Sequence, residues 1–156
     1  GGRPAYALAV VDVMAALDAE GGADPVAALA ASLEPGGRLA TLCHVCYELR
    51  LHRARGYGAL KGILEILASA QPLTLTEVSR QLGRTPGSTK DYLSWLEDVD
   101  LVVARARRYS FCDALLRVWV RLHCRPTPPT TEAIGREVQR YAAACLPDVE
   151  SAAALP

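Results

Sequence analysis

The sequence lacks a long apolar run and a leader segment. No apolar stretch approaches the roughly 20 residues that a membrane span requires, and the opening stretch, residues 5–17, contains Asp12. That stretch also lacks the basic leader and small-residue cleavage site of a secretory signal. The sequence therefore predicts a cytoplasmic protein. Its start at Gly1 without Met predicts a piece of a longer chain.

The chain also lacks net charge, with 17 basic and 17 acidic residues. The charges are nevertheless unevenly placed. Residues 1–37 have one arginine against five acidic residues, whereas residues 99–125 have six arginines against two aspartates. A basic segment of this kind is typical of a nucleic-acid-binding face, but a solvated basic surface without a partner is the commoner outcome. Both interpretations stay open.

Cysteines are few and odd in number, at five. This favours reduced thiols over a disulfide framework. Cys43 and Cys46 have the spacing of zinc and redox motifs, but no second ligand pair follows at similar spacing. The pair also lies in an apolar helical stretch rather than after a strand. We therefore expect two ordinary helix residues and no metal site.

The first part of the chain predicts three helices. One follows Pro4 and ends before the Gly21-Gly22 pair, and a short one begins after the Asp24-Pro25 cap. A third covers residues 39–53. Its predicted inward face consists of Leu42, Cys46 and Leu49, with Val45 as a further candidate.

The second part predicts a helix-turn-helix. Apolar residues at helical spacing predict a helix that begins at Tyr57 and ends near Ser69; they are Leu60, Ile63, Leu64 and Leu67. Thr74 or Thr76 then caps a short helix that ends at Leu82, and Gly83 supplies the turn. The next helix opens at Thr85-Pro86 and ends near Asp98, with Tyr92, Leu93 and Leu96 as its buried stripe.

A wing is predicted directly after the second helix of this pair. Residues 101–105 and 109–111 have strand character, and residues 106–108 form a basic turn. Asp113 is expected to cap a helix over residues 114–123, with Trp119 in the core, and a proline-rich linker and a last helix follow. The predicted fold is mainly α. It consists of a helical lid-like bundle, a winged helix-turn-helix with a two-stranded wing, and a C-terminal helix, over residues 1–55, 56–125 and 126–156.

Several motifs in this segment resemble the C-terminal winged helix of archaeal-type ATPases, a STAND branch of the AAA+ superfamily. The matching motifs are Thr74–Gly83, Tyr92–Leu96 and Tyr109–Trp119. The sequence departs from the family pattern at Ala114, usually Pro, and at Val118, usually Phe. The opening residues Gly1–Tyr6 are similar to the segment that begins the helical lid of those ATPases.

The resemblance implies that Gly2 and Pro4 contact a nucleotide, and that ATP and Mg²⁺ belong to a parent protein whose P-loop core lies upstream. This chain itself holds no cofactor. Residues 83–90 are not a P-loop, because three residues instead of four separate the glycines and the lysine comes last.

Two functions remain open. One is a non-catalytic regulatory module that contacts the ATPase core or another protein, with Trp95 as either an interface anchor or a core-edge residue. The alternative is a DNA-binding domain that contacts mainly the DNA backbone. The residues predicted to bind DNA or a partner are Arg84, Ser88, Thr89, Lys90, Arg105, Arg107 and Arg108.

Enzyme activity is not expected of the chain. Its histidines, His44, His52 and His123, have no serine or aspartate partner at a recognisable spacing. The acidic residues are dispersed along helix exteriors.

Overall fold

The computed structural model describes residues 3–19, 24–54 and 56–145. The chain divides into two compact units, which we call the helical unit (Gly1–Ala40 with Thr127–Pro156) and the winged unit (Thr41–Pro126). The first boundary between the two units therefore lies after Ala40. The ranges 1–55, 56–125 and 126–156 remain a prediction for independently folding domains.

The helical unit contains α1 (Pro4–Ala19), α2 (Pro25–Ser32) and α8 (Thr131–Cys145). The carboxylate of Asp24 accepts hydrogen bonds from the backbone N–H groups of Val26 and Ala27 at 3.0 and 3.2 Å, so the predicted cap and the Pro25 start are confirmed. Both α1 and α8 pack against α2. The last helix therefore belongs to the same unit as the first two, although it is about a hundred residues away from them in sequence.

Helix α3 (Arg38–Arg53) buries a different face from the predicted one. Its buried line has a spacing of four residues and consists of Leu39, Cys43, Tyr47 and Leu51. Val45 and Leu49 are 48% and 62% exposed, so their predicted inward orientation is wrong. The reason is the Tyr47 side chain, whose ring lies 5.3 Å from the ring of Trp119 and turns this line of the helix inward.

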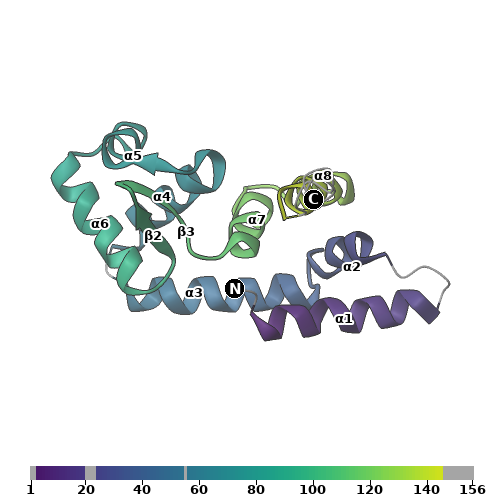
Figure 1. Cartoon of the computed structure of the whole chain (residues 1–156). Helices are drawn as coiled ribbons and strands as arrows, with labels where there is room; N and C mark the ends of the chain where they lie inside the picture. Colours follow the sequence, from purple (N-terminus) through teal and green to yellow (C-terminus); the bar gives the residue numbers. More distant parts are fainter. Residues whose placement is uncertain (1–2, 20–23, 55, 146–156) are drawn as a thin grey trace, which may run out of the picture. The chain divides into compact units, whose positions relative to one another are not determined.

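Four helices make up most of the winged unit (Figure 1): α4 (Tyr57–Ala70), α5 (Leu75–Leu82), α6 (Pro86–Asp98) and α7 (Ala114–His123). Helix α4 packs against each of the other three. Its predicted apolar stripe is fully buried and consists of Leu60, Ile63, Leu64 and Leu67. The spacing of these residues therefore identified the helix at the centre of the core.

The sheet of the winged unit has three antiparallel strands in the order β1-β3-β2. The two wing strands, β2 (Val102–Arg105) and β3 (Arg108–Phe111), confirm the predicted hairpin and with it the mainly α, winged fold. Strand β1 (Leu73–Thr74) was not predicted. It has two residues, too few for a periodic pattern, and it exists through its pairing with Tyr109 and Arg108 of β3.

Trp119 lies in the core of the winged unit, as predicted, with 5% of its surface exposed. Its ring stacks on His123 of the same helix at 5.6 Å and lies 5.7 Å from His44 of α3. Helix α7 begins directly after Asp113, which is its N-cap as predicted. The Asp113 carboxylate accepts hydrogen bonds from Leu115 N–H and Leu116 N–H at 3.1 Å.

The start of α5 provides a first test of this fold. The Thr74 hydroxyl accepts a hydrogen bond from Glu77 N–H at 3.3 Å, and the Glu77 carboxylate accepts one from Thr74 N–H at 2.7 Å. Removing the hydroxyl with Thr74→Ala is expected to lower the free energy of unfolding by about 1 kcal/mol. The matched control is Thr76→Ala on the exposed side of the same helix. Equal losses in urea denaturation would contradict the capping role.

Candidate nucleic-acid interface

The turn between α5 and α6 is built by local backbone chemistry. Gly83 ends α5 in the left-handed conformation, with φ 68°, which favours glycine. Thr85 caps α6 through a hydrogen bond from Ser88 N–H to its hydroxyl at 3.3 Å, and Pro86 occupies the first helical position. Arg84 lies between these two caps and is exposed. The turn therefore holds the start of α6 and one cation at the surface.

Helix α6 is the second helix of the helix-turn-helix, and its two faces differ sharply. Its buried line consists of Thr89, Leu93 and Leu96. The exposed line on the opposite side consists of Gly87, Asp91, Ser94 and Asp98. Tyr92, predicted as part of the buried stripe, is only half-buried. The outermost line of the recognition helix therefore carries two carboxylates and no cation.

Two of the predicted contact residues of α6 face inward or serve the cap. Thr89 is fully buried, and its hydroxyl donates to the Thr85 carbonyl at 2.9 Å, so it is withdrawn from the contact surface. Ser88 is half-buried, and its hydroxyl donates to the same carbonyl at 3.1 Å. The cap turns these hydroxyls towards the helix start. Lys90 is exposed, as the predicted role requires.

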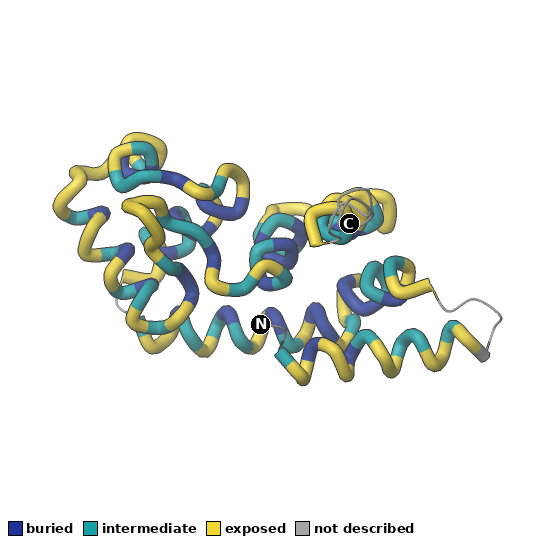
Figure 2. The backbone as a smooth tube through the Cα atoms, viewed as in Figure 1, coloured by how far each residue is buried: buried dark blue, intermediate teal, exposed yellow. Residues whose placement is uncertain are grey.

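The wing is a tight hairpin with a strained tip. Its loop consists of Ala106 and Arg107, whose φ angles are 49° and 61°. Two consecutive left-handed residues are typical of a type I′ turn, which matches the twist of the strands but normally contains asparagine and glycine. A side chain in this region costs about 1–2 kcal/mol. Residues 104–108 are all exposed (Figure 2).

The three wing arginines have different surroundings. Arg108 donates to the Pro72 carbonyl at 3.2 Å and lies 3.7 Å from the Glu77 carboxylate, so it already forms a hydrogen bond and an ion pair within the winged unit. Hydrogen bonds from the backbone and hydroxyl of Thr74 lower the pKa of Glu77, and Arg108 acts in the same direction. Arg105 and Arg107 form no ion pair within the part of the chain that the structure describes.

One carboxylate fixes the wing beside the recognition helix. Glu97 of α6 accepts a hydrogen bond from the backbone N–H of Ala104 in β2 at 3.1 Å. The helix and the strand also pack against each other. This contact therefore joins the end of α6 to strand β2 of the wing. The donor is a neutral N–H group, so the Glu97 carboxylate keeps its negative charge beside the wing.

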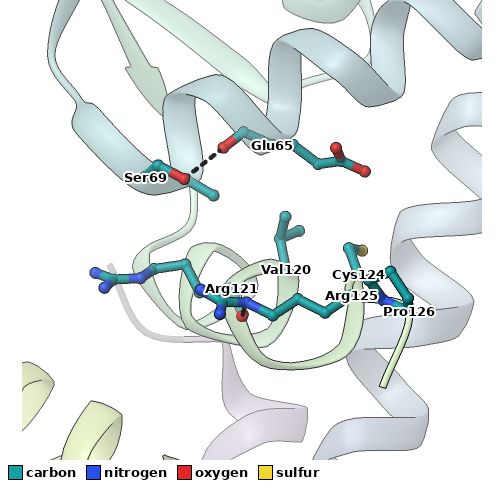
Figure 3. A pocket seen from close by; sticks show the side chains of 8 residues that line it. Glu65, Ser69, Val120, Arg121, Cys124, Arg125 and Pro126 are labelled. Carbon is teal, nitrogen blue, oxygen red and sulfur yellow. Dashed lines mark hydrogen bonds between the residues drawn. The ribbon is translucent and has the colours of Figure 1, made fainter. Parts of the chain in front are cut away.

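The residues that line the pocket between α4 and α7 do not form a nucleophile–base pair (Figure 3). Its volume is about 350 Å³. The Ser69 hydroxyl donates to the Glu65 carbonyl at 3.0 Å, and burial raises the pKa of the Cys124 thiol, which keeps the thiol protonated at neutral pH. The lining residues, all of them described, contain no base hydrogen-bonded to this thiol: Glu65, Ala68, Ser69, Val120, Arg121, Cys124, Arg125 and Pro126.

Trp95 lies at the edge of the core rather than in an open apolar face. It is half-buried and makes an edge-to-face contact with Tyr92 at 5.5 Å. A Cβ atom at Gly56 would lie 3.4 Å from its ring. Of the two interpretations left open by the sequence, these contacts favour the core edge.

The cysteine and nucleotide predictions concern the first part of the chain. Cys43 is buried and Cys46 half-buried on α3. The described residues contain no group of three or more histidine, cysteine or acidic side chains that could hold a metal ion. Pro4 is exposed at the start of α1, and Gly2 lies outside the described residues. No described helix has the length and apolar character needed to cross a membrane.

No family model and no curated protein match the sequence. Among solved structures, a MarR family protein of Mycobacterium tuberculosis is similar to this chain, with a TM-score of 0.39 and 18% sequence identity. The similarity covers 74% of this chain and 82% of that one.

The predicted resemblance to archaeal-type ATPases is wrong. The structural similarity found is to a MarR family protein and not to an ATPase lid region, and no family model of such ATPases matches. The nucleotide contacts of Gly2 and Pro4, the ATP and Mg²⁺ of a parent protein and the ATPase core as partner depended on that resemblance and are withdrawn with it. The chain retains a winged helix-turn-helix with an exposed, basic wing tip.

Proposed function

We propose that the chain binds double-stranded DNA through its winged unit, as a regulator without catalytic activity of its own. The start of α6 enters the major groove, and the wing tip contacts the phosphate backbone. The observation that carries this proposal is Arg107, an exposed arginine held in a left-handed turn conformation without an ion-pair partner among the described residues. A strained position occupied by a charged residue favours a functional role over a structural one.

The charges of the surface support backbone-dominated binding. Four exposed cations lie on the turn, the start of α6 and the wing: Arg84, Lys90, Arg105 and Arg107. Asp91 and Asp98 on the outer line of α6 oppose them and reduce the attraction to phosphate. The start of α6 adds a favourable helix dipole. We therefore expect modest affinity with a strong dependence on salt.

A titration of a labelled duplex, followed by fluorescence anisotropy, tests the proposal. We expect binding at low salt that weakens as the salt concentration rises. The logarithm of the association constant is expected to fall linearly with the logarithm of the salt concentration, with a slope of about −2 to −4, because each neutralised phosphate contributes about −0.9. The absence of binding at the lowest salt concentration, or an affinity that does not change with salt, would overturn the proposal.

The strained wing tip gives a sharper prediction. Arg107→Gly removes a side chain from the left-handed region, so the free energy of unfolding is expected to stay unchanged or to rise by up to about 1 kcal/mol. DNA affinity is expected to fall about 10- to 100-fold, because a charge-assisted hydrogen bond is worth about 1.5–3 kcal/mol.

The control is Ala106→Gly, which relieves the same conformation in the same turn without removing a charge. It is expected to match Arg107→Gly in urea denaturation and the unmodified protein in DNA affinity. If both glycine variants bound DNA equally well, Arg107 would have no role in binding.

A further inference from the structure

We infer that Asp91 makes the recognition helix selective for cytosine in the major groove. This inference rests on the proposed function, because it concerns the same surface and names the base that the surface reads. The Asp91 carboxylate repels phosphate and lowers the affinity of the helix for the DNA backbone. A contact with a base edge would explain its presence on this surface, because base contacts supply sequence specificity.

Asp91 has the position that base contact requires. It lies in the first half of α6, on the exposed line opposite Thr89 and Leu93. Helix-turn-helix proteins contact base edges with residues near the start of this helix. No described residue donates a hydrogen bond to the Asp91 carboxylate or forms an ion pair with it. Within the described part of the chain, the carboxylate is therefore open to a hydrogen-bond donor from DNA.

The chemistry of a carboxylate selects among the bases. An ionised aspartate only accepts hydrogen bonds. In the major groove guanine presents two acceptors and thymine presents an acceptor and a methyl group, which leaves the amino groups of cytosine and adenine as donors. Adenine also presents its N7 acceptor beside that amino group, which repels a second carboxylate oxygen. Cytosine is therefore the base that suits Asp91 best.

Lys90 extends the same selectivity to the opposite strand. It precedes Asp91 on the helix, is exposed, and can donate to the N7 and O6 acceptors of guanine. Successive residues of an α-helix are about 100° apart around its axis, so Lys90 and Asp91 leave the same turn of the helix in different directions. Lys90 can therefore donate to a guanine while Asp91 accepts from a cytosine, which are the two bases of a G·C pair.

Asp98 provides a matched control within the same line of α6. It is exposed, but it follows Asp91 by seven residues, which corresponds to about 10 Å along the helix axis. It therefore lies at the end of the helix, away from the half that enters the groove. A neutral substitution there changes the charge by the same amount without changing the base contact.

Selection from a randomised duplex library, followed by sequencing, tests the inference. The unmodified protein is expected to enrich a position occupied by cytosine, with a preference over adenine of about 5-fold in affinity, the lower end for a base contact, because a paired cytosine offers the carboxylate a single hydrogen. Asp91→Asn is expected to enrich adenine there, because an asparagine amide pairs with both adenine N6 and N7. Asp91→Ala is expected to lose the preference while binding random duplexes more tightly. Asp98→Asn is expected to retain the cytosine preference.

The outcomes separate this inference from the function on which it rests. DNA binding without any enriched base, or an Asp91→Asn variant that enriches the same base as the unmodified protein, would overturn the inference alone. An Asp98→Asn variant that shifts the preference as Asp91→Asn does would also overturn it. No binding of any duplex would overturn the proposed function and this inference together.

Discussion

Reversing the two wing charges that form no ion pair with a described residue, with Arg105→Glu and Arg107→Glu in one variant, is expected to weaken binding to duplex DNA by about 100-fold or more at low salt. Two charge-assisted hydrogen bonds to phosphate, worth about 1.5–3 kcal/mol each, are lost. The new carboxylates also repel the backbone. The slope of the salt dependence is expected to become shallower by about 2, since two phosphates are no longer neutralised.

The control for this variant reverses two exposed arginines of the helical unit, Arg136→Glu with Arg140→Glu in α8. It changes the formal charge of the chain by the same amount. Its affinity for DNA is expected to fall far less, because neither arginine belongs to the proposed contact surface and no hydrogen bond to phosphate is lost with it. Equal losses in the two variants would mean that binding follows total charge and that the wing has no special role.

The largest effect on stability is expected for Trp119→Ala, which should lower the free energy of unfolding by about 3–5 kcal/mol. The side chain is 5% exposed and lies against Tyr47, His44 and His123, so its loss leaves a cavity between α3 and α7 of the winged unit. A loss of this size is a large fraction of the 5–15 kcal/mol that stabilise a typical domain. Urea denaturation of the whole chain measures it.

Trp95→Ala is the matched control, because it makes the same chemical change at the half-buried edge of α6. Its loss of stability is expected to be clearly smaller, since its ring has solvent on one side and leaves a cavity that water can fill. If the two variants lost equal stability, Trp95 would belong to the core and the winged unit would be packed differently from the structure described above.

Local chemistry explains why the winged fold could be predicted from the sequence. The spacing of the apolar residues in α4, the Thr74–Glu77 capping box, Gly83 in its left-handed turn and the Asp113 cap each depend on residues within a few positions of one another. Such features require no knowledge of distant contacts. For the same reason winged helices of unrelated function share these features. The resemblance to archaeal-type ATPases depended on them and was therefore wrong.

The features that could not be predicted depend on distant pairing. Strand β1 exists because Leu73 and Thr74 meet β3, about 35 residues later in the chain. The inward face of α3 is set by the contact of Tyr47 with Trp119. The contact of α8 with α2 likewise joins residues about a hundred positions apart. None of these partners is visible in a window of local sequence.

The candidate site was predicted in part. Arg84, Lys90, Arg105 and Arg107 are exposed, as their predicted roles require. Thr89 was assigned to the wrong face of α6, because a threonine near a helix start reads as an exposed polar residue, whereas its hydroxyl here bonds the helix's own carbonyl. The contact of Arg108 with Pro72 and Glu77 depends on β1 and could not be foreseen.

Mapping of the DNA-binding surface by NMR tests the central claim most directly. Amide chemical shifts of the labelled chain are recorded while a short duplex is added at low salt. The largest changes are expected at residues 84–91 and 104–108, with little change in α8. Changes concentrated in the helical unit, or no changes at a DNA concentration well above that of the protein, would contradict the claim that the winged unit binds DNA.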